Sequence, residues 1–252
     1  VGSEMCIRDR LKEQGKIRFA GFSFHDRLQL FKEVVESAPW DFCLIQHNYL
    51  DYEYEAGCLG PKYAAANGMG LAVMKPVRTG LLARLPQSMR DALRSTGVEK
   101  PDTEWALDYL WDIPEVSVAV SGMGSMSDVE ANLRYASKAK PNMFTPDERK
   151  ALGAAIQAYR KIPGHIDCTG CYQCIPCPHN VAIGYIFAYV YNNYLVHQDK
   201  KRAIADYTVA MSPIQRGAPA SACVNCGACL AKCPQKLNIP ELLKRVRKDL
   251  ES

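Results

Sequence analysis

Hydrophobic positions follow two spacings along the first 145 residues, and one unit recurs four times. Each unit opens with a short apolar, β-branched run and continues with apolar residues every three or four positions. Short runs of this kind are typical of buried strands, and the longer segments are typical of amphipathic helices. We expect strands at residues 16–22, 41–47, 70–74 and 116–120, and helices at 27–36, before Gly68, and at 88–94, 103–111 and 127–137.

Strands that alternate with helices predict a parallel sheet with helices outside it. A further helix should run from Thr145 to about residue 160. Thr145 can cap it, Pro146 fits the first turn, and Glu148 completes a capping box. Residues 162–166 then form a linker, and two more helices are expected at about 181–195 and 200–211.

Eleven cysteines are present, and eight of them fall in two short runs near the C-terminal end. Three cysteines two residues apart can hold three corners of an iron–sulfur cubane, and a fourth followed by Pro usually ligates a second cluster. The sequence therefore predicts two [4Fe–4S] clusters. The runs read Cys168-Thr-Gly-Cys171-Tyr-Gln-Cys174-Ile-Pro-Cys177-Pro178 and Cys223-Val-Asn-Cys226-Gly-Ala-Cys229-Leu-Ala-Lys-Cys233-Pro234.

The grouping of these cysteines follows from the same geometry. A two-cluster unit places the first three cysteines of each run on one cluster and the fourth on the other. Cys233 then joins the cluster of the first run, and Cys177 joins that of the second. The first run has two residues instead of three before Cys177. This shorter spacing leaves open the alternative that Cys177 closes its own cluster.

Zinc binding and disulfide formation are less favoured interpretations of the two cysteine runs. A structural zinc site uses two Cys-x2-Cys pairs held well apart, whereas the first run packs four cysteines into ten residues. No export signal is evident, so a reducing, cytoplasmic compartment is expected, where disulfides are rare. Cys6, Cys43 and Cys58 lie outside the motifs, and we assign them no metal role.

Composition excludes two other classes of partner. The chain of 252 residues is 48% hydrophobic and 23% charged, which is an ordinary globular composition. The net charge of +4 is mild, and no basic stripe interleaved with aromatic residues indicates nucleic-acid binding. No apolar run reaches the roughly 18–20 residues of a membrane span, so no membrane partner is expected.

Four segments before the cysteine runs are characteristic. They are Gly15-Lys-Ile-Arg-Phe-Ala-Gly-Phe-Ser-Phe-His25, Gln46-His-Asn-Tyr-Leu-Asp51, Gly68-Met-Gly-Leu-Ala-Val-Met-Lys-Pro76 and Gly122-Met-Gly-Ser-Met-Ser-Asp-Val-Glu-Ala-Asn132. With these segments, residues 11–145 resemble the C-terminal half of an aldo/keto reductase, and the tail with its two cysteine runs resembles the ferredoxin-type domain of one branch of that family. The resemblance implies a fold in which four βα units, half of a (β/α)8 TIM barrel, precede a small α-helical iron–sulfur domain.

The expected domains follow from this resemblance. Residues 1–10 resemble a translated sequencing adapter and are expected to be a non-native leader of a truncated product, the alternative being a genuine polar turn. Residues 11–145 form the half-barrel, 146–167 a helix and linker, and 168–252 the iron–sulfur domain. The family's catalytic Asp, Tyr, Lys and His belong to the first four βα units, so no catalytic residue is placed here.

The resemblance also implies a nicotinamide cofactor, NADP or NAD. Ser23 matches a carboxamide-binding residue, and Gln46 could substitute for a second one or merely fill the barrel. Residues 74–80 match the loop that packs under the nicotinamide and covers the pyrophosphate. Asp128 stands where many relatives carry an Arg for the 2′-phosphate, so the choice between NADP and NAD stays open. The implied cofactor residues are Ser23, Gln46, Met74, Pro76, Val77, Gly80, Gly122, Gly124 and Asn132.

Three functions are compatible with these features. The first is an NAD(P)H-dependent oxidoreductase acting on a small carbonyl substrate and inactive as this fragment. The second is an electron-transfer module that serves a redox partner protein, with the barrel as a docking scaffold. In the third, the clusters have only a structural role and fix the C-terminal tail against the barrel. Hydride carries two electrons and a cluster takes one, and the sequence shows no flavin signature to bridge them.

Overall fold

The computed structural model describes residues 2–211 and 217–251, and the side chains of residues 2–6, including Cys6, lie outside the described part. The chain divides into two compact units. One contains the chain up to Leu85 and Val98–Arg149, and the other contains Pro86–Gly97 and the chain from Lys150 onward. The N-terminal helix α1 (Gly2–Glu13) includes most of the stretch that was expected to be a leader.

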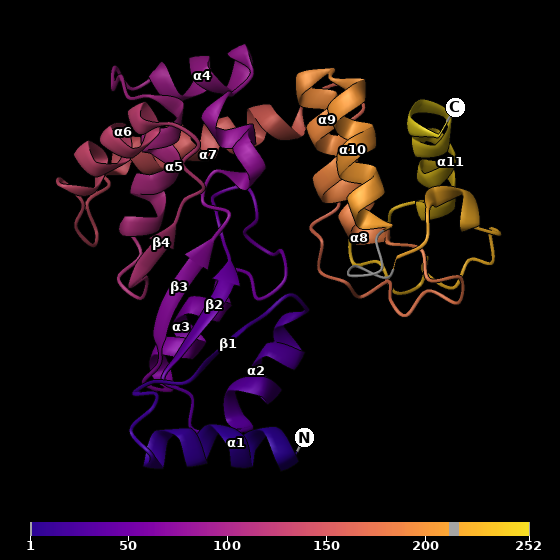
Figure 1. Ribbon diagram of the computed structural model, residues 1–252. Coiled ribbons are helices and arrows are strands. Elements are labelled where there is room, and N and C mark those ends of the chain that lie inside the picture. The colour runs from indigo at the N-terminus through magenta and orange to yellow at the C-terminus, as the bar shows by residue number, and fades with distance from the viewer. Residues whose placement is uncertain (1, 212–216, 252) are drawn as a thin grey trace. The chain divides into compact units, whose positions relative to one another are not determined.

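The first unit contains a parallel sheet of four strands in the order β1-β2-β3-β4 (Figure 1). This arrangement confirms the predicted succession of βα units. β2 and β3 have the longest pairing, in which Phe42 lies beside Gly70 and Gln46 beside Met74. The strands are β1 (Gly21–Ser23), β2 (Phe42–Gln46), β3 (Gly70–Met74) and β4 (Val118–Val120).

Helices follow the strands as the hydrophobic periodicity predicted. A core of buried side chains, with Phe31, Ile45 and Leu71 among its members, lies between the sheet and its helices. The short helix α4 (Gln87–Arg94) belongs to the second unit. The helical segments of the first unit are α2 (Leu28–Glu36), α3 (Leu59–Ala66), η1 (Arg78–Ala83), α5 (Asp102–Trp111) and α6 (Met126–Ala136).

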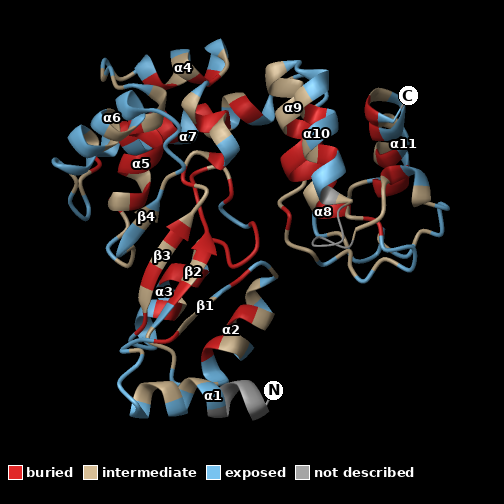
Figure 2. Cartoon of the chain, viewed as in Figure 1, coloured by how far each residue is buried: buried red, intermediate tan, exposed pale blue. Residues whose placement is uncertain are grey.

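The two outer strands of the sheet are short, and β4 is mostly exposed. β2 and β3 are largely buried, whereas β4 lies at the surface (Figure 2). Val118 and Val120 are 54% and 49% exposed, and the described residues of α6 include no buried side chain. β1 and β4 each pair on one side only in the described sheet. The sheet is therefore an open half-barrel with apolar side chains along one edge.

The second unit is helical. α7 (Pro146–Arg160) begins in the first unit and continues into the second, and it opens with the predicted capping box, in which Glu148 N–H donates to Thr145 Oγ1 (3.2 Å). None of the described helices has the length and apolarity required to cross a membrane. The remaining helices are α8 (Ile183–Tyr185), the π-helical η2 (Ile186–Tyr191), α9 (Asn192–His197), α10 (Lys200–Ala210), η3 (Ala220–Ala222) and α11 (Ile239–Leu250).

Candidate metal centre

The two cysteine runs adopt matching backbone conformations. The second residue after the first cysteine has a positive φ in both, 65° at Gly170 and 59° at Asn225. The residue after the second cysteine also has a positive φ in both, 57° at Tyr172 and 75° at Gly227. A bulky residue such as Tyr rarely adopts this region. Because the two runs share this pattern of φ angles, they form equivalent loops. Each loop curves around a space on its inner side.

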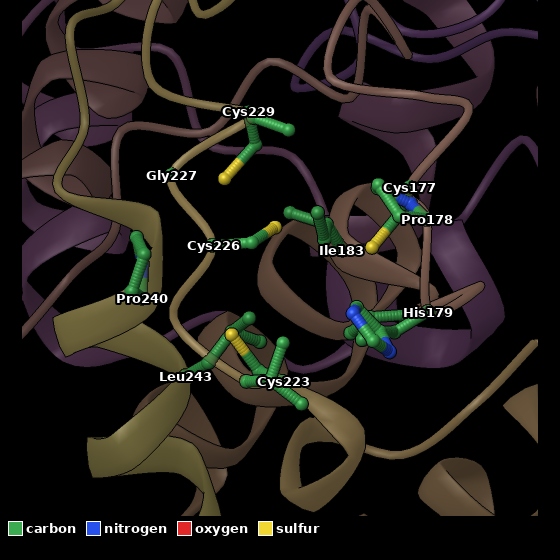
Figure 3. A pocket seen from close by; sticks show the side chains of 13 residues that line it. Cys177, Pro178, His179, Ile183, Cys223, Cys226, Gly227, Cys229, Pro240 and Leu243 are labelled. Carbon is green, nitrogen blue, oxygen red and sulfur yellow. The ribbon is translucent and has the colours of Figure 1, made fainter.

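Each loop borders a cavity that also receives one cysteine from the other loop. Figure 3 shows Cys177 facing the cavity of the second run, together with Cys223, Cys226 and Cys229. The other cavity is lined by the first three cysteines of the first run together with Cys233. The structure therefore brings together all eight predicted cysteines, in the crossed grouping that the spacing favoured. The shorter spacing before Cys177 does not prevent this residue from reaching the second run.

The chemistry of the cavities fits iron–sulfur clusters. Their empty volumes are about 350 Å³ each, open solvent included. Ile183 lines both cavities, and neither lining includes a carboxylate. Among residues 2–211 and 217–251, no group of three or more His, Cys, Asp or Glu side chains is arranged to hold a single metal ion. The other lining residues are mostly apolar, apart from His179 in one cavity and Thr169, Tyr172 and Gln235 in the other. The four thiols around each cavity form the donor set of a [4Fe–4S] cluster.

Burial disfavours the thiolate form of two of these cysteines, so this form requires a nearby positive charge. The pKa of Cys168 and that of Cys174 are raised to about 12, mainly because burial penalises the thiolate. Neighbouring thiols in the same group raise the pKa further in both cases. A bound metal offsets this penalty with its positive charge, since the thiolate is the form that ligates.

Hydrogen bonds from buried side chains anchor the chain beside both cysteine runs. Asn192 is buried, donates to the carbonyl oxygen of Ile166 (2.8 Å) and accepts from its N–H (3.0 Å). Tyr207 Oη accepts from Ala220 N–H (2.6 Å) and donates to Glu251. Ile166 precedes Cys168 by two residues and Ala220 precedes Cys223 by three, so both loops start from fixed positions.

Replacing Tyr207 with Phe is expected to lower the free energy of unfolding by roughly 1–3 kcal/mol at neutral pH, because the buried Ala220 N–H loses its acceptor. Burial raises the pKa of Glu251, but hydrogen bonds from Tyr207 and Ser221 outweigh it, and the pKa lies below the ordinary 4.5. A lowered carboxyl pKa contributes stability above pH 4.5 that disappears as the pH falls through the folded-state value. The decrease in the free energy of unfolding caused by Tyr207→Phe should therefore become smaller as the pH falls.

Chemical denaturation between pH 3.5 and 7 measures this dependence. Glu251→Gln is the matched variant, because it removes the titrating carboxyl and leaves an acceptor for the tyrosine hydroxyl. A cost of Tyr207→Phe that grows as the pH falls would contradict the assignment.

A second group of predicted residues lies at the carboxyl ends of the strands. Ser23 ends β1 and pairs with Leu44, Gln46 ends β2 and pairs with Met74, and Met74 ends β3 and pairs with Val120. Carboxyl ends of neighbouring parallel strands meet at one edge of a sheet, which is where β/α barrels bind ligands. The predicted cofactor residues of the first three strands therefore share this edge.

A buried polar network lies at the same edge. The Asp51 carboxylate accepts from Gln46 Nε2 (3.0 Å) and Asn48 Nδ2 (2.6 Å), and Oδ1 lies 3.1 Å from Arg78 Nε. Gln46 Oε1 is buried and has no hydrogen-bond partner among the described residues. The hydrogen bond from Nε2 to Asp51 thus holds the Gln46 side chain in place, while its Oε1 is left as an acceptor without a partner among the described residues. The motifs did not single out Asp51 and Arg78, whose pairing depends on the β2–β3 register.

The loop after β3 carries several residues in left-handed conformations. Lys75, Arg78, Thr79 and Gly80 all have positive φ, between 46° and 92°. Non-glycine residues rarely adopt this region unless the surroundings impose it. The buried Arg78–Asp51 pair provides one such constraint. The predicted Pro76, Val77 and Gly80 lie in this constrained loop, where Pro76 is buried and the other two are half-buried.

A carboxylate caps the start of α6, next to the implied cofactor residues Gly122 and Gly124. The Asp128 carboxylate accepts from Gly124 N–H (3.2 Å) and Ser125 N–H (3.1 Å) and completes a capping box with Ser125. Gly122 and Gly124 are exposed, and Asn132 Nδ2 donates to Ser121 Oγ (3.1 Å). Helix N-termini are common phosphate-binding positions, but here the Asp128 carboxylate already accepts from these two N–H groups.

Comparison with known proteins assigns both units. Residues 6–145 match the model of the aldo/keto reductase family, and residues 167–238 match a model described as a 4Fe-4S dicluster domain. The matches therefore pair an aldo/keto reductase domain of α/β fold with a 4Fe-4S dicluster domain. Because the first match spans more than half of the residues, the chain belongs to the aldo/keto reductase family.

Solved structures of aldo-keto reductase AKR11C1 from Bacillus halodurans are similar to this chain. The holo form is 26% identical in sequence to this chain, and the TM-score is 0.48. The match covers 58% of this chain and 53% of the holo-form chain. The apo form is 25% identical, with coverages of 58% and 54% and a TM-score of 0.47. The chain spans about half the length of these structures. No curated protein matches it.

Proposed function

We propose that the C-terminal domain binds two [4Fe–4S] clusters through crossed sets of cysteines. One set is Cys168, Cys171, Cys174 and Cys233, and the other is Cys177, Cys223, Cys226 and Cys229. The observation that carries the proposal is that each cavity is lined by four thiols drawn from both runs. Such clusters supply one-electron transfer when bound, and the protein sets their potential through its hydrogen bonds and burial.

Iron and acid-labile sulfide analysis of the chain prepared without oxygen tests this proposal. Two cubanes correspond to about eight irons per chain. A content of about four would reduce the proposal to one cluster, and stoichiometric zinc would overturn it.

We further propose that the barrel unit belongs to an NAD(P)H-dependent reductase of small carbonyl compounds. Support comes from the strand-end residues Ser23, Gln46 and Met74, the constrained loop 75–80, and Gly122 and Asn132 beyond β4. These residues would hold and orient the dinucleotide. The Asp128 carboxylate at the start of α6 repels a 2′-phosphate by its charge, which favours NAD over NADP.

The chain of 252 residues is expected to show no carbonyl reductase activity. The resemblance provides no counterpart of the family's catalytic Asp, Tyr, Lys and His among residues 11–145, and general acid catalysis alone is worth roughly 10²–10⁴-fold in rate. Oxidation of NADH and NADPH in the presence of a panel of aldehydes measures this. Protein-dependent turnover that persists after removal of contaminating reductases would contradict the expectation.

The second candidate function is an electron-transfer module that exchanges single electrons with a redox partner protein. The solvent-facing position of Cys226 favours it, because a cluster there lies within reach of a docked partner. Reduction potentials recorded with and without NADH and a carbonyl compound separate the two functions. Cluster potentials, measured with dithionite as the electron donor, that NADH and the carbonyl compound leave unchanged support the module.

A further inference from the structure

One buried hydroxyl beside the first cysteine run has no assigned role. Thr169 follows Cys168 directly and lines the cavity shared by the first run and Cys233. Its Oγ1 is buried and has no hydrogen-bond partner among the described residues. A buried hydroxyl without a partner costs roughly 1–3 kcal/mol. Such an atom beside an apolar cavity therefore indicates that the cavity's occupant accepts its hydrogen bond.

The second run lacks this donor at the equivalent position. The matching φ angles at Gly170 and Asn225 align Thr169 with Val224. Val224 carries no hydrogen-bonding group in its side chain and is 60% exposed. The two cavities therefore differ at this position in hydrogen bonding and in access to water.

Packing holds the turn that carries Thr169 in place. Gly170 is buried, and a Cβ added to Gly184 of α8 would lie 3.7 Å from the Gly170 Cα and 3.6 Å from the Tyr172 ring. On the other side, Asn192 fixes Ile166 through two hydrogen bonds. The hydroxyl thus lies in a turn that is held on both sides and is placed in advance for its acceptor.

We propose that the Thr169 hydroxyl donates a hydrogen bond to a sulfur of the cluster held by Cys168, Cys171, Cys174 and Cys233, and that this bond raises the reduction potential of that cluster. Reduction adds one electron to the cluster without making or breaking a bond. A donor stabilises the added negative charge, and hydrogen bonds to the sulfurs raise the reduction potential. The proposal rests on the proposed binding of two clusters.

A redox titration of the anaerobically prepared full chain, followed by electron paramagnetic resonance with dithionite as reductant, tests the proposal. The unaltered protein should show two one-electron steps. Thr169→Val, which keeps the side-chain shape, should lower the potential of only one of the two steps, by about tenfold in the reduced-to-oxidised ratio, or about 59 mV. Thr169→Ala should shift it in the same direction, and Thr169→Ser should restore it.

Val224→Thr is the matched control. Val224 lines the cavity of the other cluster and is 60% exposed, so a hydroxyl there should leave the step that depends on Thr169 unchanged. The proposal is overturned if Thr169→Val moves neither step while iron content stays full, or if Thr169→Ser shifts the step as far as Thr169→Val. An equal shift of the same step from Val224→Thr also overturns it. Iron analysis separates these results from a failure of the proposed function, in which the unaltered chain would not assemble two clusters.

Discussion

Replacing Cys233 with Ser is expected to remove the cluster associated with the first cysteine run, although the substitution lies in the second run. Cys233 lines the same cavity as Cys168, Cys171 and Cys174. A cubane deprived of one of four thiolates loses its attachment, so iron should fall from about eight to about four per chain. Iron analysis and electron paramagnetic resonance of the reduced protein measure the loss.

Double substitutions identify which cluster is lost. With crossed ligation, adding Cys174→Ser to Cys233→Ser removes no further iron, because both residues serve one cluster. Adding Cys229→Ser instead should remove nearly all the iron. Local ligation predicts the reverse pattern, and observing that pattern would refute the assignment. Cys58→Ser, outside both cavities, is the control and should leave iron content unchanged.

Replacing Asp51 with Asn is expected to destabilise the barrel unit by roughly 3–5 kcal/mol, because removing the charge of one partner breaks a buried ion pair. The side chains of Asp51 and Arg78 are 2% and 3% exposed. The carboxylate also accepts from Gln46 and Asn48, and an amide in its place cannot accept from all of them at once. Since whole domains are stable by about 5–15 kcal/mol, this loss is large.

Urea denaturation followed by circular dichroism measures the effect. Asp91→Asn is the control, since Asp91 is exposed and accepts from Gln87 Nε2 (2.6 Å) on the surface of α4. Exposed substitutions usually change stability by less than about 0.5 kcal/mol. If the two variants lost the same small amount, the buried network would not be a stabilising element.

The sequence predicted the fold best where hydrophobic spacing alone determines an element. β3 has its predicted bounds because it is paired on both sides. β1 and β4 are shorter than predicted, at three residues each, because each pairs with a single neighbouring strand and the run before it stays unpaired. The C-terminal helix α11 was missed, although buried Ile239, Leu243, Val246 and Leu250 recur on one face. That periodicity, with Pro240 in the first turn, would have revealed it.

The residues of the candidate sites also fall into two groups, those that local sequence spacing predicts and those that it does not. Local spacing predicted the eight cysteines that line the two cavities, since a cubane imposes the distances between its ligands. Asp51 and Arg78 are 27 positions apart, and only the β2–β3 register brings them together. The capping box of Ser125 and Asp128 has a local signature that was overlooked, and it changes the interpretation of the glycines before it.

Two clusters held in the crossed way would also act as cross-links in the unfolding equilibrium. Each one joins the two cysteine runs across the intervening residues 178–222. By the chain-entropy reasoning applied to disulfides, closing a loop of about 45 residues stabilises the folded state by about 4 kcal/mol. The second closure should add less, because the first already restrains the same segment. Oxygen damage to one cluster would thus leave the domain joined, and loss of both would release the whole segment at once.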